Sequence, residues 1–195
     1  MSSTILRPAL VLFGALTLLC GVLYPAAVSG VGRVAFAHQA DGSLVTAGGK
    51  TIGSSLIGQP FSQPGHFWGR PSATGPMPNN GAGSSGSNQG PTNPALVDAV
   101  KGRVDALKAA DPANTAPVPV DLVTASASGL DPEISLAAAY YQANRVAAAR
   151  KLPLQQVRDL IGRQRQDPAL GFLGEVRVNV LALNLALDNM KAPAR

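Results

Sequence analysis

The sequence predicts an α+β protein, in which a single N-terminal transmembrane helix is followed by one small mixed α/β domain with long loops. Three observations support this fold class. A run of 25 residues near the N-terminus contains no charged side chain. Helical apolar stripes and short β-branched runs make up the rest of the chain, and a Gly- and Pro-rich stretch interrupts them. We therefore divide the chain into an anchor region, residues 1–34, and a soluble accessory domain, residues 35–195.

Charge is scarce in the first half of the chain. Only 14% of the 195 residues are charged, and residues 1–97 carry one acid and four bases. The net charge of +5 therefore reflects a shortage of acids, and no three Lys or Arg residues stand in a row. Nucleic-acid binding, which needs a concentrated basic patch, is not predicted. The single cysteine, Cys20, rules out a disulfide framework and a Cys-built zinc site.

The uncharged run lies between Arg7 and Arg33 and predicts a membrane anchor in contact with lipid. As a helix it would extend about 37 Å, which exceeds the ~30 Å hydrocarbon core of a bilayer. Its most apolar part is Ala9–Tyr24, and the following Pro25 marks either the outer interface or a kink. Arg7 and the N-terminal amine slightly favour a cytoplasmic N-terminus, which would place residues 35–195 outside the cytoplasm.

A cleaved secretory signal is the alternative to an anchor. The charged start, the apolar run and the small residues Ala35 and Ala37 around Phe36 are all typical of such a signal. The apolar run is longer than the usual signal core of about 7–15 residues, so the uncleaved anchor is favoured. If the segment were cleaved, the chain would be an exported binding protein or enzyme.

The region after the anchor predicts a hairpin and a long loop. β-Forming residues flank the turn at Gly48-Gly49, in Leu44–Thr46 and in Thr51-Ile52. Residues 74–94, named here the polar loop, contain 18 Gly, Pro, Asn, Ser or Thr residues among 21 and no charge. Loops longer than about 15 residues are usually functional or disordered. On composition alone, a flexible linker is favoured.

The start of the second half predicts a helix and then a strand. Asn93 and Pro94 are an N-cap and first-turn pair, and an apolar stripe follows them as far as Leu107. This helix is expected to end before Asp111-Pro112. The β-branched run Val118–Thr124 then predicts a strand.

Further helices are predicted towards the C-terminus. Asp131-Pro132-Glu133 combines a cap, a proline and an acid, and should open a helix that runs to Arg150-Lys151. Pro153 should start a short helix over residues 154–161. Residues 176–190 alternate as a strand would, but fifteen residues exceed a normal strand, so a helix is favoured.

The short motifs in the sequence do not indicate an active site. Gly49-Lys50-Thr51 resembles the end of a phosphate-binding loop, but Leu44 stands where that motif needs glycine. Residues 81–86 match the glycine pattern of dinucleotide-binding loops, but neither a strand nor a helix flanks them. The two histidines, His38 and His66, have no further ligand near them in sequence, so no metal site is predicted. A binding or accessory role is favoured over catalysis.

Several blocks of sequence together resemble one protein family. They are Gly53–Gln59, Phe67–Ala73, Ser87–Pro94, Asp121–Pro132, and Arg177–Val180 leading to Leu183–Asp188. With these blocks in this order, the chain closely resembles the C subunit of the Kdp-type potassium-transporting ATPase, a bacterial high-affinity K+ uptake pump. The resemblance covers nearly the whole chain and includes the single N-terminal helix. It implies a non-catalytic accessory subunit in the bacterial plasma membrane.

The resemblance also implies partners, a cofactor and site residues. In that family a channel-like subunit carries K+ and a P-type subunit hydrolyses ATP. The C subunit acts as a catalytic chaperone that raises the ATP affinity of the P-type subunit, and it stabilises the assembly. The family's nucleotide contact is a glutamine after an Ala-Ala-x-aromatic stretch, which falls on Gln142. The family's serine–glycine segment falls on residues 126–129, with Ser126, Ser128 and Gly129 as further implied ATP contacts.

The predicted orientation and the implied ATP contact disagree. If residues 35–195 lie outside the cytoplasm, ATP is absent from their surroundings, and Gln142 has no nucleotide to bind. The domain would then stand beside the outer K+ entrance and stabilise the complex there. Both alternatives describe an accessory subunit that has no active site of its own.

Overall fold

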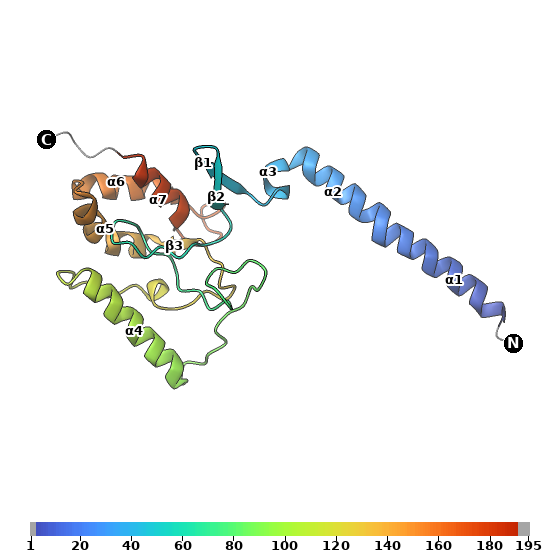
Figure 1. The fold of residues 1–195 in the computed structure, drawn as a ribbon, viewed down its shortest axis with the longest axis horizontal. Helices are drawn as coiled ribbons and strands as arrows, with labels where there is room; N and C mark the ends of the chain where they lie inside the picture. Colours follow the sequence, from blue (N-terminus) through green and yellow to red (C-terminus); the bar gives the residue numbers. More distant parts are fainter. Residues whose placement is uncertain (1–2, 191–195) are drawn as a thin grey trace. The chain divides into compact units, whose positions relative to one another are not determined.

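The structure is a computed structural model that describes residues 3–190 (Figure 1). It divides into two compact units, and the boundary between them falls after Ile52. The first unit contains a long N-terminal helix and most of a hairpin, whose second strand crosses the boundary, and the second unit contains the later helices and a three-stranded sheet. The predicted α+β class is confirmed, whereas the anchor boundary after residue 34 stays a prediction.

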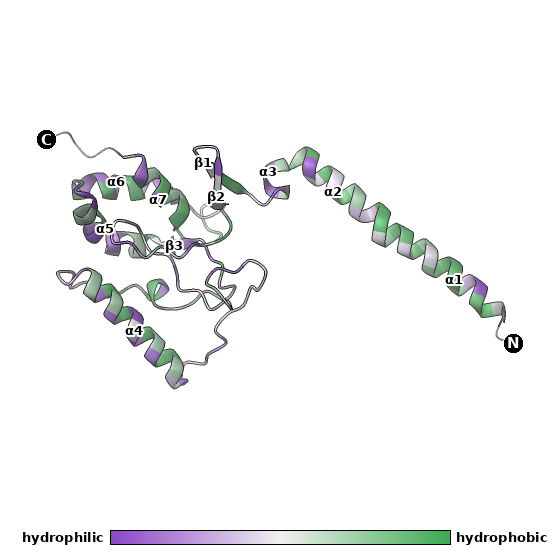
Figure 2. Ribbon diagram, viewed as in Figure 1, coloured by the Kyte–Doolittle hydropathy of each residue, from purple (hydrophilic) through white to green (hydrophobic). Residues whose placement is uncertain are grey.

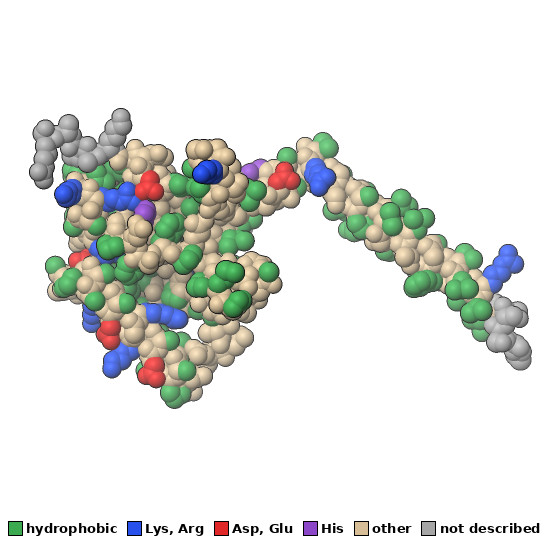
Figure 3. Space-filling model, in the orientation of Figure 1, with side chains coloured by type: hydrophobic (Ala, Val, Ile, Leu, Met, Phe, Trp, Pro, Cys, Tyr) green, Lys and Arg blue, Asp and Glu red, His purple; other side chains and the backbone are tan. Residues whose placement is uncertain are grey.

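One long apolar helix dominates the first unit. It consists, in order, of α1 (Ser3–Leu18), a π-helical turn (Leu19–Leu23) and α2 (Tyr24–Ala35). The 31 residues of Ile5–Ala35 are long and apolar enough to cross a membrane, and none of the most apolar stretch is buried. Figure 2 shows this helix as largely hydrophobic, and Figure 3 shows blue basic side chains only near its two ends. The predicted N-terminal apolar helix is confirmed.

Pro25 does not interrupt this helix. The π turn ends directly before α2, in which Pro25 is the second residue. Proline lacks a backbone N–H, and its ring crowds the carbonyl four residues earlier, which here belongs to Gly21. In the π turn the backbone N–H of Tyr24 donates to the carbonyl of Leu19, five residues back, which widens the helix locally. The helix therefore continues through the proline to Ala35.

A short helix and a hairpin follow the long helix. They are α3 (Ala37–Ala40), β1 (Leu44–Ala47) and β2 (Lys50–Ser54), and the two strands pair in a two-stranded sheet. The turn residues Gly48 and Gly49 have φ angles of 56° and 77°. Positive φ at both central residues is typical of the type I′ turn, whose twist matches that of the flanking strands. The predicted hairpin is confirmed, and it accounts for Gly48 and Gly49 without a bound phosphate.

The second unit contains five helical elements and three short strands within the described part of the chain. The helices are α4 (Pro94–Ala110), the 3-10 turn η2 (Val120–Leu122), α5 (Leu136–Arg150), α6 (Leu154–Gln164) and α7 (Val180–Asp188). The strands are β3 (Glu133–Ser135), β4 (Arg165–Gln166) and β5 (Arg177–Asn179). The central strand β5 pairs antiparallel with both β3 and β4.

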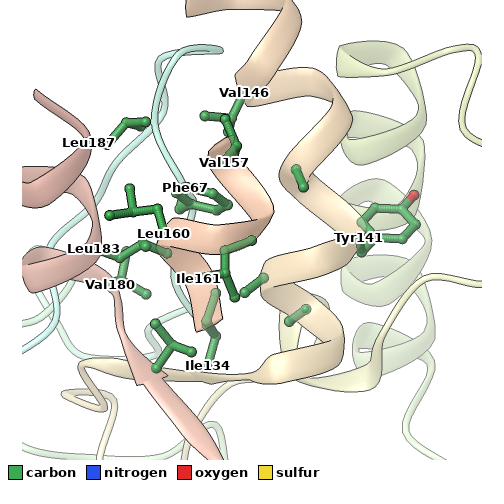
Figure 4. Packing of buried hydrophobic residues seen from close by; sticks show 14 of the residues in the cluster. Phe67, Ile134, Tyr141, Val146, Val157, Leu160, Ile161, Val180, Leu183 and Leu187 are labelled. Atoms are coloured by element: carbon green, nitrogen blue, oxygen red, sulfur yellow. The ribbon is translucent and has the colours of Figure 1, made fainter. Parts of the chain in front are cut away.

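The core of the second unit lies among α5, α6 and α7 (Figure 4). Phe67, which precedes the polar loop, is fully buried there with Val146 of α5, Val157 of α6 and Leu183 of α7. Full burial of such a side chain contributes about 1.5–3 kcal/mol to stability. Alanines such as the fully buried Ala143 line the inner face of α5, which lets α6 pack closely against it. An internal segment that lacks regular structure therefore supplies a central core residue.

The predictions for α4 and α6 are confirmed. The side chain of Asn93 caps α4 by accepting a hydrogen bond from the backbone N–H of Ala95 at 2.9 Å, and Pro94 occupies the first turn. α4 ends at Ala110, as predicted, and α6 begins directly after Pro153. Both helices are predicted by local signals, because the Asn93 cap of α4 and a proline beside the start of each helix act within one turn.

The strand predicted at Val118–Thr124 is wrong, because the structure has the 3-10 turn η2 there. Pro119 lacks the backbone donor that a strand needs. The carboxylate of Asp121 accepts hydrogen bonds from the backbone N–H of Ser135, at 2.7 Å, and from its hydroxyl, at 3.2 Å. The chain therefore turns at Asp121 so that its side chain can bind the end of β3, and Leu122 is buried beside it.

The helix predicted to open at Asp131 begins five residues later, at Leu136, so this start is wrong. Residues 133–135 form β3 instead, and the hydroxyl of Ser135 caps α5. The predicted end of this helix at Arg150 is correct.

The helix favoured for residues 176–190 is correct only in its second part. Residues 177–179 form β5, and α7 begins directly after them at Val180. A three-residue strand that runs straight into a helix has no turn signal at the junction. Only its pairing identifies it, here with Ile134 of β3 opposite Val178 of β5.

Candidate functional site

Two helices hold the end of residues 63–68, named here the clamped segment, through side-chain amides that bind the backbone of Phe67 and Trp68. The N–H of Phe67 donates to Oδ1 of Asn184 in α7 at 2.8 Å, and Nδ2 of Asn184 donates to the carbonyl of Phe67 at 3.0 Å. The N–H of Trp68 donates to Oε1 of Gln142 in α5 at 2.8 Å, and Nε2 of Gln142 donates to the carbonyl of Trp68 at 3.1 Å. Each amide therefore supplies one donor and one acceptor to the backbone, as a neighbouring strand would. The side chains of Gln142 and Asn184 are named here the amide clamp, or clamp for short.

Gln142 uses its full hydrogen-bonding capacity inside the domain. Its Oε1 also accepts from Nη2 of Arg145 at 2.7 Å, and its Nε2 also donates to the carbonyl of Ala138 at 3.3 Å. A glutamine side chain offers two donors and two acceptor positions, and all four are occupied. The residue is only 1% exposed. In this conformation Gln142 positions Trp68 and presents no free polar atom to solvent.

Arg145 links the clamp to the ring of Trp68. Its guanidinium carbon lies 4.2 Å from the centroid of that ring, within the range of a cation–π interaction, and its Nη1 donates to the carbonyl of Pro64. Burial lowers the pKa of Arg145 to about 10, and the carboxylate of Asp111 opposes this shift. Burial and the same carboxylate raise the pKa of Tyr141. At neutral pH Arg145 stays charged, and this buried charge is balanced by Asp111 and by the hydrogen bonds it makes.

A second arginine holds the outer side of the clamped segment. Nε of Arg150 donates to the carbonyl of Gly65 at 2.6 Å, and its Nη2 donates to Oδ1 of Asp188 at 2.5 Å. Nε2 of His66 lies 3.3 Å from the same carboxylate oxygen. The side chain of Asp188 is 47% exposed, so water screens this group more than it screens the buried amide clamp.

The serine–glycine segment, residues 126–129, holds the polar loop. The carbonyl of Ser128 accepts hydrogen bonds from the backbone N–H of Ser85 and the hydroxyl of Ser84, both at 3.0 Å. The carbonyl of Gly129 accepts from the hydroxyl of Ser72 at 2.7 Å. Ser126 is buried, and its carbonyl accepts from the N–H of Gly129 at 3.3 Å. This segment therefore serves the domain mainly through its carbonyl groups.

Gly129 is required by both its conformation and its surroundings. Its φ is 67°, in the left-handed region that favours glycine. A Cβ atom placed there would lie 2.6 Å from the carbonyl oxygen of Ser85 and 2.6 Å from Cγ2 of Thr74. Gly86 approaches the segment equally closely, because a Cβ there would lie 2.8 Å from the carbonyl oxygen of Ala127. The backbone of the polar loop and that of the serine–glycine segment therefore approach so closely that neither glycine can be replaced by a residue with a Cβ atom.

Two hydroxyl groups, one just before the polar loop and one at its first residue, act as hydrogen-bonding centres. Oγ of Ser72, just before the loop, accepts from the backbone N–H of Asn79 at 2.9 Å and lies 3.0 Å from the hydroxyl oxygen of Thr74. Oγ1 of Thr74 accepts from the N–H of Asn80 at 3.0 Å and donates to the carbonyl of Met77 at 2.7 Å. The loop prediction is correct, but this part is bonded to its own domain and differs from the flexible linker that composition favours. Its uncharged side chains are the donors and acceptors that fold it.

A hollow of about 350 Å3 opens beside the clamp. Its lining includes Phe61, Trp68, Arg70 and Arg103. Nη1 of Arg70 pairs with a carboxylate oxygen of Asp131 at 3.0 Å. Arg103 donates to a backbone carbonyl, and burial lowers its pKa. Aromatic faces and guanidinium groups thus meet in one place.

The structure assigns the sequence-predicted site residues to two hydrogen-bonded groups. Gln142 binds the clamped segment, while Ser126, Ser128 and Gly129 bind the polar loop and its approach. None of these four residues lines the hollow beside Trp68. Their contact with ATP stays a prediction. Between residues 3 and 190, no three His, Cys, Asp or Glu side chains are grouped as a metal ion would require.

Sequence reasoning missed Asn184, Arg145 and Trp68 as members of this arrangement. A signal exists for one of them: Asn184, like the predicted Gln142, is a polar residue within the sequence of a partly apolar helix, α7 and α5 respectively. Buried amides need partners, so such positions indicate a backbone segment held against a helix. The identity of that segment depends on contacts across 74 and 117 residues, which no local pattern reveals.

Comparison with known proteins finds one family. The model of the family described as "K+-transporting ATPase, c chain" (KdpC) matches residues 6–189. The potassium-transporting ATPase KdpC subunit of Herminiimonas arsenicoxydans is 70% identical over 188 residues, covering 96% of this chain and 98% of the relative. Those of Janthinobacterium sp. (strain Marseille) and Polaromonas naphthalenivorans are each 68% identical, covering 93% and 96% of this chain and 96% and 95% of the relatives.

Proposed function

This chain belongs to the KdpC family of K+-transporting ATPase c chains, and on that premise we propose that it is an anchored accessory subunit that stabilises the pump at its outer face. The observation that carries the proposal is the unburied apolar helix Ile5–Ala35, which a soluble enzyme of this size would have no means to cover. Its partners would be a channel-like K+-translocating subunit and a P-type ATP-hydrolysing subunit, with lipid around the helix.

The charges beside the helix support an outer location for the domain. Arg7 and the N-terminal amine precede the apolar stretch, and Arg33 is followed by no further Lys or Arg until Lys50. Positively charged residues accumulate on the cytoplasmic side of membrane helices, which slightly favours a cytoplasmic N-terminus. An outer domain has no ATP to bind. The saturated hydrogen bonds of Gln142 agree with this, since they leave it a positioning role.

A second candidate is the catalytic-chaperone role, in which the domain raises the ATP affinity of the hydrolysing subunit. The observation in its favour is the hollow beside Trp68, where an aromatic ring and the guanidinium group of Arg103 would face an anionic ligand, while Arg70 stays paired with Asp131. This role requires the domain to face the cytoplasm. The side of the membrane therefore decides between the two candidates.

Thiol labelling would determine that side. Cys20 is the only cysteine, so Cys20→Ser gives a background on which Lys101→Cys places one thiol on the exposed face of α4. A membrane-impermeant maleimide should label this thiol in intact cells and leave it unlabelled in sealed inverted vesicles. A Ser3→Cys variant should give the opposite pattern. Labelling of Lys101→Cys only in inverted vesicles would contradict the outer location and favour the chaperone role.

Co-purification tests the subunit role. A tagged full-length chain should recover K+-stimulated ATPase activity with its partner subunits, while the purified chain alone should hydrolyse no ATP. Removal of residues 1–34 should release the domain from the membrane complex. A mature N-terminus near His38, determined by N-terminal sequencing, would indicate a cleaved signal and an exported protein instead.

A further inference from the structure

The turn between β4 and β5 carries three large apolar side chains in solvent. Leu170, Phe172 and Leu173 are 83%, 73% and 53% exposed, and residues 170–173 are named here the apolar tip. Two backbone hydrogen bonds hold these residues in a tight turn. The N–H of Ala169 donates to the carbonyl of Leu173 at 3.1 Å, and the N–H of Leu173 donates to the carbonyl of Ala169 at 2.9 Å. The tip is therefore a folded projection with its apolar side chains outward.

Leu170 adopts a backbone conformation that leucine normally avoids. Its φ is 56°, in the left-handed region, and the following Gly171 has a φ of 80°. Leucine at such a position is strained, whereas glycine would not be. Because Leu170 is largely exposed, packing within the domain does not repay this strain. Strained residues often occur where a side chain is needed for binding.

The concentration of apolar side chains at the tip is not repeated in the described part of the second unit. Its other large exposed hydrophobic residues stand one at a time along the sequence; they are Leu56, Met77, Val97, Val120 and Tyr140. Single exposed hydrophobic residues are ordinary on protein surfaces, whereas a contiguous apolar group indicates an interaction site. Three of the four residues of the tip form such a group.

The charges beside the tip distinguish between a lipid surface and a protein surface. Arg165 pairs with Asp167 at 2.5 Å, and Arg177 pairs with Glu133 at 2.6 Å. Two nearby arginines are therefore already neutralised within the domain. Glu175 adds a negative charge two residues after Leu173. An anionic lipid surface attracts unpaired Lys and Arg and repels acids, so the surroundings of the tip do not suit it.

We propose that the apolar tip inserts into an uncharged, apolar socket on another protein subunit of the same K+-transporting ATPase complex. This inference rests on the proposed function, because it takes the complex as given. Phe172 and Leu170 fill the socket as anchor residues, and the paired charges around them form a polar rim. The bound subunit compensates the strain at Leu170.

Photo-crosslinking in the assembled complex would identify what covers the tip. The photoreactive residue p-benzoylphenylalanine, introduced at Phe172 of the full-length chain, should crosslink to one K+-ATPase subunit identified by mass spectrometry. The same residue at Val97 on α4 serves as the exposed control and should crosslink to that subunit much less. Crosslinks from position 172 to lipid alone, or to a second copy of this chain, would overturn the proposal.

Substitutions separate binding from folding. Leu170→Gly removes the side chain and relieves the backbone strain, so it should keep or raise the melting temperature of the chain. It should nevertheless reduce recovery of the partner subunits, and Leu170→Gly with Phe172→Ser should reduce it by about tenfold or more, as expected for anchor residues. Leu56→Ser with Val97→Ser is the matched control with unchanged recovery. Unchanged recovery of partners by the tip variant would overturn the inference alone, whereas failure of the wild-type chain to recover them would overturn the proposed function.

Discussion

Gln142 and Trp68 are joined by two hydrogen bonds, one in each direction, although 74 residues separate them. Asn184 of α7 forms the same pair of hydrogen bonds with Phe67, the residue directly before Trp68. Consecutive residues of the clamped segment are thus held by amides on two different helices. This arrangement fixes the only tryptophan of the chain and buries the phenylalanine beside it.

Loss of the Gln142 amide should destabilise the domain strongly. Gln142→Ala leaves the backbone groups of Trp68 and one guanidinium bond of Arg145 without partners in a buried site, so the free energy of unfolding should fall by about 2–4 kcal/mol. Urea unfolding of the full chain in detergent, followed by the fluorescence of Trp68, measures this. Gln156→Ala, at an exposed position of α6, is the matched control.

The same variant tests the alternative role of Gln142. If its main role is to contact ATP, Gln142→Ala would leave the unfolding curve unchanged and raise the KM of the complex for ATP. A destabilised chain whose assembled complex keeps its KM for ATP would agree with a positioning role.

Loss of the partly exposed carboxylate of Asp188 should lower the free energy of unfolding much less than loss of the Gln142 amide. Asp188→Ala removes the partner of Arg150 and His66, but this group is partly exposed and screened by water. The loss should stay below about 1 kcal/mol and shrink further in high salt. Unfolding measurements at two salt concentrations check this. A loss as large as that of Gln142→Ala would contradict the distinction between the buried clamp and its outer side.

The close contact between Gly86 and the serine–glycine segment leaves no room for a side chain at position 86. Gly86→Ala would press a Cβ against the carbonyl of Ala127 and should cost about 1–3 kcal/mol. Gly90→Ala is the control, because a Cβ there meets nothing within 4 Å. Limited proteolysis should show faster cleavage in the polar loop of Gly86→Ala only. Equal cleavage of both variants would argue against a loop held by this contact.

Gly102→Ala should stabilise the protein. Gly102 lies in the interior of α4, and a Cβ there meets nothing within 4 Å. Alanine is favoured over glycine inside a helix by about 0.5–1 kcal/mol. The melting temperature of the second unit, followed by Trp68 fluorescence, should rise accordingly. A decrease would indicate that this face of α4 is covered in a way that the structure does not show.

Elements with signals inside one turn could be predicted from the sequence. The hairpin depends on Gly48-Gly49, and α4 depends on Asn93 and Pro94, so both are recognisable from neighbouring residues. β3 and β5 could not be recognised, because each has only three residues and the pairing between them joins positions more than 40 residues apart. The error at Val118–Thr124 has the same origin, since the carboxylate of Asp121 bends the chain towards Ser135.

The candidate site also depends on contacts between residues that are far apart in the sequence, and these could not be predicted. The serine–glycine segment was found through family resemblance, but its use as a holder of the polar loop depends on the carbonyls of Ser128 and Gly129, which no side-chain pattern reports. The linker interpretation of residues 74–94 differs from the structure for this reason. Uncharged polar composition is compatible both with a solvated chain and with one whose hydroxyls and amides bond their own backbone.

The amide clamp also bears on what happens before assembly. An extended segment with free N–H and C=O groups is a template on which other chains can add strands and aggregate. At Phe67 and Trp68 those groups are occupied by side chains fixed on helices, so an unassembled copy offers no open edge there. The amides of Gln142 and Asn184 therefore keep this stretch of backbone from pairing with strands of other chains.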